Sequence, residues 1–192
     1  MTDRPARPTA PRLAPVADPT PEQSEVLAAA GTRPGRDPLN IFSTMVHNRR
    51  VANRSVLLGG AFLGKGTIAP REREIVILRV GHNASAVYEF GQHVVIGRRE
   101  GLTDAEITDL ASDAPTHDWS ANDRALIALA DEICADDCVG DATWATLAAT
   151  YSDEQMVELL MLAGYYRMIS GFLNSAGVQL DEGVPGWPED WD

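Results

Sequence analysis

The chain carries repeated start signals for α-helices and almost none for β-strands, and this restricts its fold more than any other feature. Two capping boxes open apolar segments, one at Thr103 with Glu106 and one at Ser152 with Gln155. Elsewhere, apolar residues recur at helical spacing, and glycine or proline stands near the segment ends. The sequence therefore predicts an all-α fold with a core of helical hairpins.

Two consecutive segments of this pattern predict one such hairpin. In residues 69–81, Pro70 suits a first helical turn, and Gly81 is the expected end of the helix. In residues 85–101, Ser85 is the expected cap, and Gly101 is expected to follow the last turn. A turn near residues 81–84 would then set the two helices side by side. Further helices are expected over residues 22–31, 39–48, 53–64, 103–111, 122–134, 141–150 and 152–177.

Proline is concentrated at the N-terminus, where eight of the 12 prolines lie at or before Pro38. Such a stretch offers too little apolar surface to hold itself in place. We therefore expect residues 1–21 to form a flexible arm, residues 22–184 a single helical domain, and residues 185–192 a C-terminal tail. A length of 192 residues agrees with one domain.

The charge balance bears on possible partners. With 16 Lys and Arg against 28 Asp and Glu, the net charge is −12, which repels nucleic acid and anionic membranes. The sequence contains no signal peptide and no run of 18 apolar residues. We therefore expect a cytoplasmic protein that acts on a small molecule, without nucleic acid or membrane as a partner.

The segment VYEFGQH, residues 87–93, carries the strongest sign of chemistry. Glu89 and His93 stand four residues apart, so a helix places them on one face within hydrogen-bonding reach. A carboxylate there would fix the imidazole tautomer and raise its pKa. The alternative is a solvated polar face. The apolar neighbours and the adjacent Tyr88 favour a packed helix and a functional pair.

The preceding helix offers a third member of this site. Glu74 stands 15 residues before Glu89, and a hairpin turn would bring its carboxylate against the pair. Glu74, Glu89 and His93 are thus candidates for a proton relay, with His93 as the proton donor. For an anionic group of the substrate, Arg79 is the first candidate, ahead of three other arginines that are equally well explained as surface ion pairs: Arg71, Arg73 and Arg167.

Two further candidates for substrate binding are aromatic. Tyr88 lies beside the pair, and Tyr166, with Tyr165, lies in the apolar C-terminal helix. Packing residues of a helical core would show the same spacing. Glu74, Glu89 and His93 could in principle chelate a metal, but the sequence has no cluster of two histidines and no zinc-like ligand spacing, so we expect no metal and no cofactor.

Three segments of the sequence resemble a known family. The stretch PREREIVILR from Pro70, the motif YEFGQH from Tyr88 with Gly97 and Gly101 beyond it, and the tail ELLMLAGYYRMISGFLN resemble the carboxymuconolactone decarboxylase family over roughly residues 40–180. That family includes alkyl hydroperoxidase D, a thiol peroxidase with a glutamate, a Cys-x2-Cys pair and a histidine. Its glutamate corresponds to Glu74 and its histidine to His93.

The two cysteines of the peroxidase correspond to Ala86 and Glu89, so the chain is more similar to the decarboxylase branch, which has Glu-x3-His here. The resemblance implies an alkyl hydroperoxidase D-like helical fold, a homo-oligomer (trimer or hexamer), and cofactor-free acid–base chemistry on a small carboxylated or lactone-type molecule. Decarboxylation is the first candidate for the reaction, and isomerisation or dehydration is the next.

Two other functions remain open at this point. A thiol peroxidase could use Cys134 and Cys138, although their spacing is one residue longer than Cys-x2-Cys and their surroundings are acidic. A non-catalytic oligomeric ligand-binding protein could have kept the helices and lost the chemistry.

Overall fold

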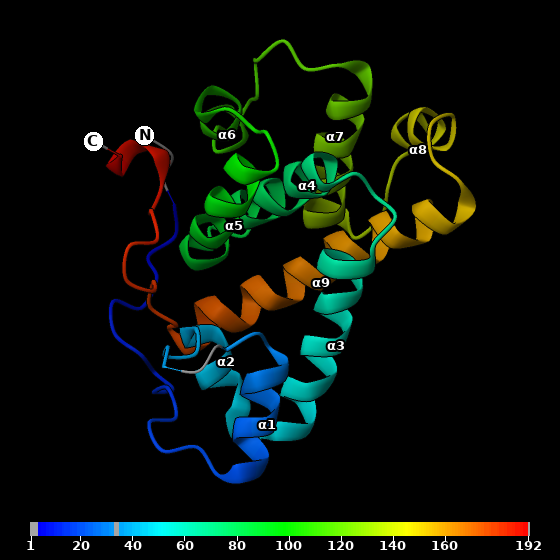
Figure 1. The fold of residues 1–192 in the computed structure, drawn as a ribbon. Helices are drawn as coiled ribbons and strands as arrows, with labels where there is room; N and C mark the ends of the chain where they lie inside the picture. Colours follow the sequence, from blue (N-terminus) through cyan, green and yellow to red (C-terminus); the bar gives the residue numbers. More distant parts are fainter. Residues whose placement is uncertain (1–3, 33–34, 192) are drawn as a thin grey trace.

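The computed structural model describes residues 4–32 and 35–191, and the regular structure in these residues is helical, with no β-strand (Figure 1). The prediction of an all-α fold is confirmed. The helices are α1 Pro21–Ala29, α2 Asn40–Met45, α3 Arg49–Lys65, α4 Pro70–Asn83, α5 Val87–Arg99, α6 Asp104–Leu110, α7 Ala121–Asp136, α8 Asp141–Ala148 and α9 Asp153–Ala176, with short 3-10 helices at Val46–Asn48 and Pro188–Asp190.

Helix α4 is the centre of the fold. Its run from Ile75 to Leu78 has no solvent exposure, and Val80 is equally buried. A helix that is apolar on all sides has to be surrounded, and α4 packs against α5, α7 and α9. The polar residues of α4 are thereby carried into the interior with the apolar ones, which is why Glu74 lies at the core and not at the surface.

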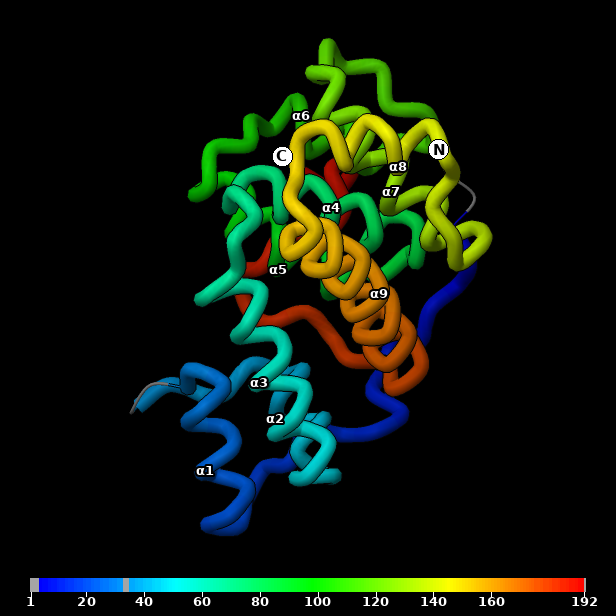
Figure 2. Tube along the Cα trace, turned by 90° about the vertical axis from the view of Figure 1, so that its right-hand side faces the viewer, coloured from blue at the N-terminus to red at the C-terminus, as the bar shows by residue number. Residues whose placement is uncertain are grey.

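Two apolar clusters meet along α9. Helices α4 to α8 form the part of the molecule above α9 in Figure 1, and α1 to α3 form the part below it; Figure 2 shows the same division from the side. The larger cluster contains Phe90, and the smaller one contains Tyr88, while Tyr165 of α9 packs against both. By length and composition alone α9 could cross a membrane, but here it serves as the core helix that joins the two clusters.

The hairpin of α4 and α5 forms as expected, but two details of its turn were predicted wrongly. Gly81 does not end α4, which continues to Asn83. A Cβ at Gly81 would lie 3.3 Å from the backbone nitrogen of Phe90. The glycine therefore allows α4 and α5 to pack closely. Ser85 is not the cap of α5; it takes a left-handed φ of 48° in the turn, and Ala86 precedes the helix without a side-chain cap.

Both capping boxes are confirmed. The Thr103 hydroxyl accepts from the Glu106 amide, and the Ser152 hydroxyl accepts from the Gln155 amide, with the reciprocal side-chain bonds present in each case. Gly101, with a φ of +99°, follows the end of α5 as expected.

The N-terminal arm, expected to be flexible, lies against its own chain over the residues that the structure describes. The Arg4 guanidinium stacks on the Trp187 ring, 3.7 Å from its centroid. Further along, the amides of Arg12 and Leu13 both donate to the Ala176 carbonyl at the end of α9. Arm and C-terminal tail thus run side by side along one edge of the molecule (Figure 1).

Candidate active site

The α4/α5 hairpin brings Glu74, Glu89 and His93 together. His93 Nδ1 lies 2.6 Å from Glu74 Oε2, and His93 Nε2 lies 3.1 Å from Glu89 Oε1. One turn beyond the histidine, a Cβ at Gly97 would lie in a tight contact 3.1 Å from Leu102 and at an ordinary contact distance of 3.8 Å from Glu74. The imidazole therefore bridges a carboxylate of each helix.

Charge is partly balanced behind the imidazole. Glu74 has no solvent exposure, and its second oxygen accepts from Arg73 Nε at 2.9 Å. Arg73 is itself buried. Buried carboxylates are stable only with such partners. The result is a short row of alternating charges, which runs from the Arg73 guanidinium through Glu74 and His93 to Glu89.

This row shifts the pKa values of its members. Burial by itself would lower the pKa of His93, but the Glu74 carboxylate, and after it the Glu89 carboxylate, raise it to about 9. Burial would raise the pKa of Glu74, and the charge of His93, together with Arg73, holds it below its ordinary value. At neutral pH His93 is therefore an imidazolium whose Nδ1–H donates to Glu74 and whose Nε2 forms an ion pair with Glu89.

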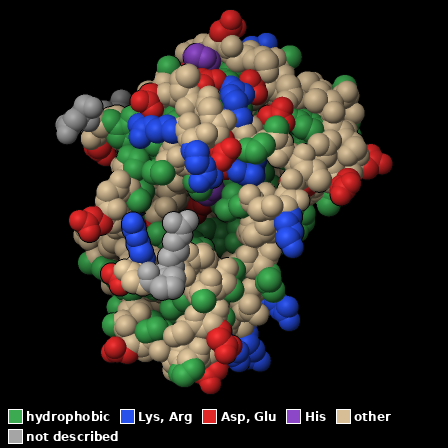
Figure 3. Space-filling model, in the orientation of Figure 1, with side chains coloured by type: hydrophobic (Ala, Val, Ile, Leu, Met, Phe, Trp, Pro, Cys, Tyr) green, Lys and Arg blue, Asp and Glu red, His purple; other side chains and the backbone are tan. Residues whose placement is uncertain are grey.

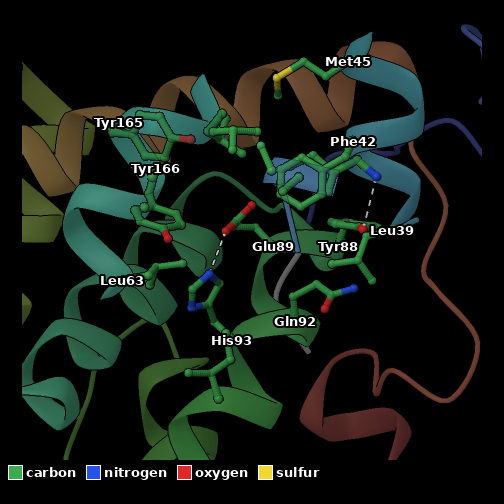
Figure 4. Close-up of a pocket in the computed structure, with 18 residues that line it drawn as sticks. Leu39, Phe42, Met45, Leu63, Tyr88, Glu89, Gln92, His93, Tyr165 and Tyr166 are labelled. Atoms are coloured by element: carbon green, nitrogen blue, oxygen red, sulfur yellow. Dashed lines mark hydrogen bonds and ion pairs between the residues drawn. The ribbon is translucent and has the colours of Figure 1, made fainter. Parts of the chain in front are cut away.

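One end of the row opens into a cavity of about 310 Å³. Glu89 and His93 line it, whereas Glu74 lies behind His93 and does not. In Figure 3 the surface is hollowed, and apolar side chains gather in the hollow; Figure 4 shows Glu89 and His93 facing each other at the cavity. The apolar wall comes chiefly from helices on the other side of the cavity: Leu39, Ile41, Phe42, Met45, Leu63 and Ile169.

Tyr88 lines the cavity, but its hydroxyl is hydrogen-bonded to other groups of the protein. The hydroxyl donates to Asp181 Oδ2 at 2.5 Å and accepts from the Ile41 amide at 3.2 Å. Gln92 Nε2 donates to the same Asp181 oxygen at 2.6 Å, and the Asn40 amide donates to the other. Burial and the bond to Asp181 raise the pKa of Tyr88. Asp181 thus ties the segment that follows α9 to Tyr88 and Gln92 of the cavity lining.

The paired tyrosines of α9 occupy different positions at the cavity. The Tyr165 hydroxyl donates to the Ser55 carbonyl at 2.9 Å and also contacts the Ser55 hydroxyl. Tyr166 stands edge-on to the His93 ring, with centroids 5.0 Å apart (Figure 4). Its hydroxyl makes no hydrogen bond with the residues that the structure describes. Burial, and after it the charge of Glu89, raises the pKa of Tyr166 well above its ordinary value, so this phenol is a neutral donor.

Arg79, expected to hold a substrate anion, lies away from the cavity. Its guanidinium pairs with Asp131 at 2.5 Å and also donates to the carbonyls of Leu110 and Ser112. The expectation is therefore corrected: Arg79 joins α4 to α7 and to the end of α6. The three weaker candidates are engaged as well, Arg71 by Glu106 and Asp123, Arg73 by Glu74, and Arg167 by Asp137.

The two cysteines also lie elsewhere. Cys134 is partly buried in α7, Cys138 is exposed beyond its end, and both are free thiols. Neither lines the cavity. Burial raises the pKa of Cys134, which reduces the thiolate fraction that peroxide chemistry needs.

Three parts of the site had no usable signal in the sequence. Asp181 belongs to the irregular segment after α9, Gln92 resembles any polar helix residue, and the apolar wall comes from α2, α3 and α9 and the residue before α2. A buried tyrosine hydroxyl requires a hydrogen-bond partner. This requirement alone could have indicated that a polar residue such as Asp181 lies next to Tyr88.

Residues 52–132 match the model of the carboxymuconolactone decarboxylase family. These residues include Glu74, Glu89 and His93. No curated protein matches the chain in sequence.

Several solved structures share the fold over 70–98% of this chain. An uncharacterised peroxidase-related protein from Silicibacter sp. has a TM-score of 0.76 at 18% identity, covering 98% of this chain and 100% of that one. The alkylhydroperoxidase AhpD core of an uncharacterised peroxidase-related protein from Ralstonia eutropha has a TM-score of 0.70 at 19% identity, covering 90% and 95%. A protein of unknown function from Agrobacterium tumefaciens, described as an antioxidant defence protein AhpD, has a TM-score of 0.65 at 18% identity, covering 70% and 93%. These likenesses confirm the predicted alkyl hydroperoxidase D-like fold.

Proposed function

We propose, from the match of residues 52–132 to the model of the carboxymuconolactone decarboxylase family and from the geometry of the site, that the protein is an enzyme that moves a proton on a small lactone-type or carboxylated molecule without a cofactor. The observation that carries the proposal is the buried row of Glu74, His93 and Glu89, whose last member lies in an apolar cavity. Ionisable groups of shifted pKa in a cavity mark functional sites more often than structural ones.

Glu89 is the group in this row that exchanges the proton with the substrate. Both nitrogens of His93 are directed at carboxylates, so a proton from His93 reaches the cavity through Glu89. In this scheme Glu89 takes a proton from the carbon next to a carbonyl and returns it, and the His93 imidazolium holds the carboxylate in place and supplies a proton through it when the reaction consumes one. Glu74, paired with Arg73, stabilises the imidazolium.

Tyr166 supplies the other half of this chemistry. Removing a proton from the carbon next to a carbonyl puts negative charge on the carbonyl oxygen, which needs a donor. The Tyr166 hydroxyl is neutral, lies at the cavity beside His93 and has no bond to a described residue. Returning the proton to another carbon gives isomerisation. Loss of hydroxide from the neighbouring carbon, protonated by the relay as it leaves, gives dehydration. If the carbon next to the carbonyl carries a carboxylate, loss of carbon dioxide takes the place of proton removal and puts the same charge on the carbonyl oxygen; a proton from the relay to that carbon completes a decarboxylation.

The positions of the thiols favour acid–base chemistry over a thiol peroxidase. Ala86 and Glu89 stand where the peroxidase motif has cysteine, and Cys134 and Cys138 do not line the cavity. The third possibility, ligand binding without catalysis, would use the same cavity, but it does not require a histidine with a raised pKa. Both alternatives are distinguished by experiment.

Hydrogen exchange at carbon tests the proposal without knowledge of the complete reaction. The protein is incubated in deuterium oxide with a panel of small lactones and cyclic ketones, and deuterium incorporation next to the carbonyl is followed by proton NMR. We expect catalysed exchange that falls by at least about 100-fold in Glu89→Gln and by about 100-fold in Tyr166→Phe. Equal exchange in wild type and Glu89→Gln would refute the proposal.

Two controls separate the alternatives in the same experiment. The double variant Cys134→Ser/Cys138→Ser should keep the exchange activity, because the thiols lie outside the cavity. Peroxide consumption that disappears in that double variant would instead support a thiol peroxidase. Tight ligand binding with no exchange, unchanged by Glu89→Gln and His93→Gln, would support a binding protein.

A further inference from the structure

The hydrogen-bonding groups of the cavity are almost all committed to the protein itself. The Tyr88 hydroxyl and the Gln92 amide nitrogen both donate to Asp181, and the Tyr165 hydroxyl donates to the Ser55 carbonyl. The Nδ1–H of His93 donates to Glu74, and its Nε2 forms an ion pair with Glu89. Among the described lining residues, the donors left are the hydroxyl of Tyr166 and the second amide N–H of Gln92.

The charge of the cavity is unfavourable for an anion. Glu89 faces it directly, and the positive charge of His93 is shared between Glu89 and Glu74. The lining residues that the structure describes include neither lysine nor arginine. Arg36 lines a neighbouring hollow at the mouth, together with Asp37, and does not reach the cavity lining.

From these observations we infer that the cavity accepts an uncharged, largely apolar substrate with a single carbonyl oxygen, such as an alkyl-substituted lactone or ketone, and rejects carboxylates. This inference rests on the proposed function for the roles of Glu89 and Tyr166. It narrows the substrate class to uncharged molecules, and among the proposed reactions it therefore favours isomerisation or dehydration over decarboxylation. One carbonyl oxygen matches the Tyr166 hydroxyl. The charge of a carboxylate would lie close to Glu89, and no described lining residue is a lysine or an arginine that could balance it.

The magnitude of the repulsion is large enough to decide selectivity. Two unit charges about 5 Å apart, at an effective dielectric constant of about 20, repel by enough to change a binding constant by roughly 100-fold. The apolar wall adds to the preference, since it favours hydrocarbon over charged groups. A cavity of about 310 Å³ lies at the lower end of ligand-binding pockets, which suits a small molecule.

A matched pair of ligands tests the inference through binding alone. The probes are 5-oxotetrahydrofuran-2-carboxylate and its methyl ester, which share the lactone ring and differ in charge, with γ-octalactone as the apolar reference. Dissociation constants are measured by calorimetry with the full chain at pH 7. We expect the methyl ester and γ-octalactone to bind at least about tenfold more tightly than the carboxylate. Equal or tighter binding of the carboxylate would overturn the inference, and so would failure of both neutral lactones to bind.

A single lysine at the rim provides the second test. Leu63 lines the cavity at 40% exposure, so Leu63→Lys adds a cation there without burying it, whereas Leu57, on the same helix at 56% exposure, lies outside the lining. Leu63→Lys should improve carboxylate binding by about tenfold and leave the neutral lactones little changed, and Leu57→Lys should alter neither. Identical affinities in the two lysine variants would contradict a charge-based selection.

Binding selectivity and catalysis are measured separately, so the two proposals are tested independently. Neutral lactones that bind selectively without deuterium exchange would leave the charge inference intact and refute the proposed chemistry. Deuterium exchange on a carboxylated lactone that binds more tightly than its ester would support the proposed chemistry and refute the charge inference.

Discussion

Nδ1 of His93 lies 2.6 Å from Oε2 of Glu74, although 19 residues separate the two in the chain. Glu74 is fully buried, and His93 is only 4% exposed. A contact of this kind is not a surface ion pair of negligible energy, because both partners have lost their water. The chemistry and the stability of the site should therefore depend on the same pair, and the following predictions use this dependence.

Replacing Glu74 by glutamine should lower the pKa of His93 from about 9. The variant removes the carboxylate that contributes most to the raised value, while it retains the shape of the side chain. The measurement is a titration of the imidazole signals by NMR. Glu154→Gln, at an exposed position on α9, is the control and should leave the titration unchanged. An unaltered His93 titration in Glu74→Gln would show that the pair does not set the pKa.

The raised pKa of His93 also predicts how stability changes with pH. Because the folded value is about 9 and the ordinary value is 6.5, the contribution of His93 is fully present below pH 6.5 and is lost as the pH rises through about 9. Its size is on the order of 3 kcal/mol. The free energy of unfolding, measured with urea from pH 6 to 10, should therefore fall more in wild type than in His93→Gln. Parallel curves would contradict this linkage.

Loss of the imidazole should abolish exchange activity while the fold is kept. Glutamine is preferred to alanine at position 93, since alanine would leave the two carboxylates facing each other across a void. We expect His93→Gln to reduce deuterium exchange by 100-fold or more, with an unchanged circular dichroism spectrum. Activity within a fewfold of wild type would remove His93 from the relay.

Glycine at position 91 should be essential for docking of the C-terminal tail. A Cβ there would lie 2.2 Å from the Pro185 carbonyl oxygen, so Gly91→Ala must displace the tail from α5. We expect a loss of about 1–3 kcal/mol in the free energy of unfolding. Gly171→Ala is the matched control, because no atom lies within 4 Å of its Cβ, and alanine there should stabilise α9 by roughly 0.5–1 kcal/mol. A similar effect of both variants would contradict the close packing of the tail.

Local features of the fold were largely predictable. The capping boxes at Thr103 and Ser152 and the four-residue spacing of Glu89 and His93 depend on neighbours within one or two helical turns, where backbone geometry alone places the atoms. The hairpin that carries Glu74 to His93 could be inferred from two consecutive helices and a short turn. The catalytic roles of these residues remain predictions.

The detailed ends of the hairpin were less predictable, because the same residue type serves two purposes. Gly81 has the sequence signature of a helix end, yet its lack of a side chain serves the contact with Phe90 within the hairpin. Whether a glycine ends a helix or admits a neighbour depends on what packs against it, and this information lies in another part of the chain.

The sequence by itself determined the helices, their caps and the pair Glu89/His93, since these follow from the period of 3.6 residues and from hydrogen bonds between near neighbours. Only the tertiary structure decided which charged groups belong to the site. It commits Arg79 to Asp131 and the end of α6, and it brings Asp181 from the tail to Tyr88. These pairings are settled by long-range packing, in which every buried charge must find a partner and the nearest one in space need not be near in sequence.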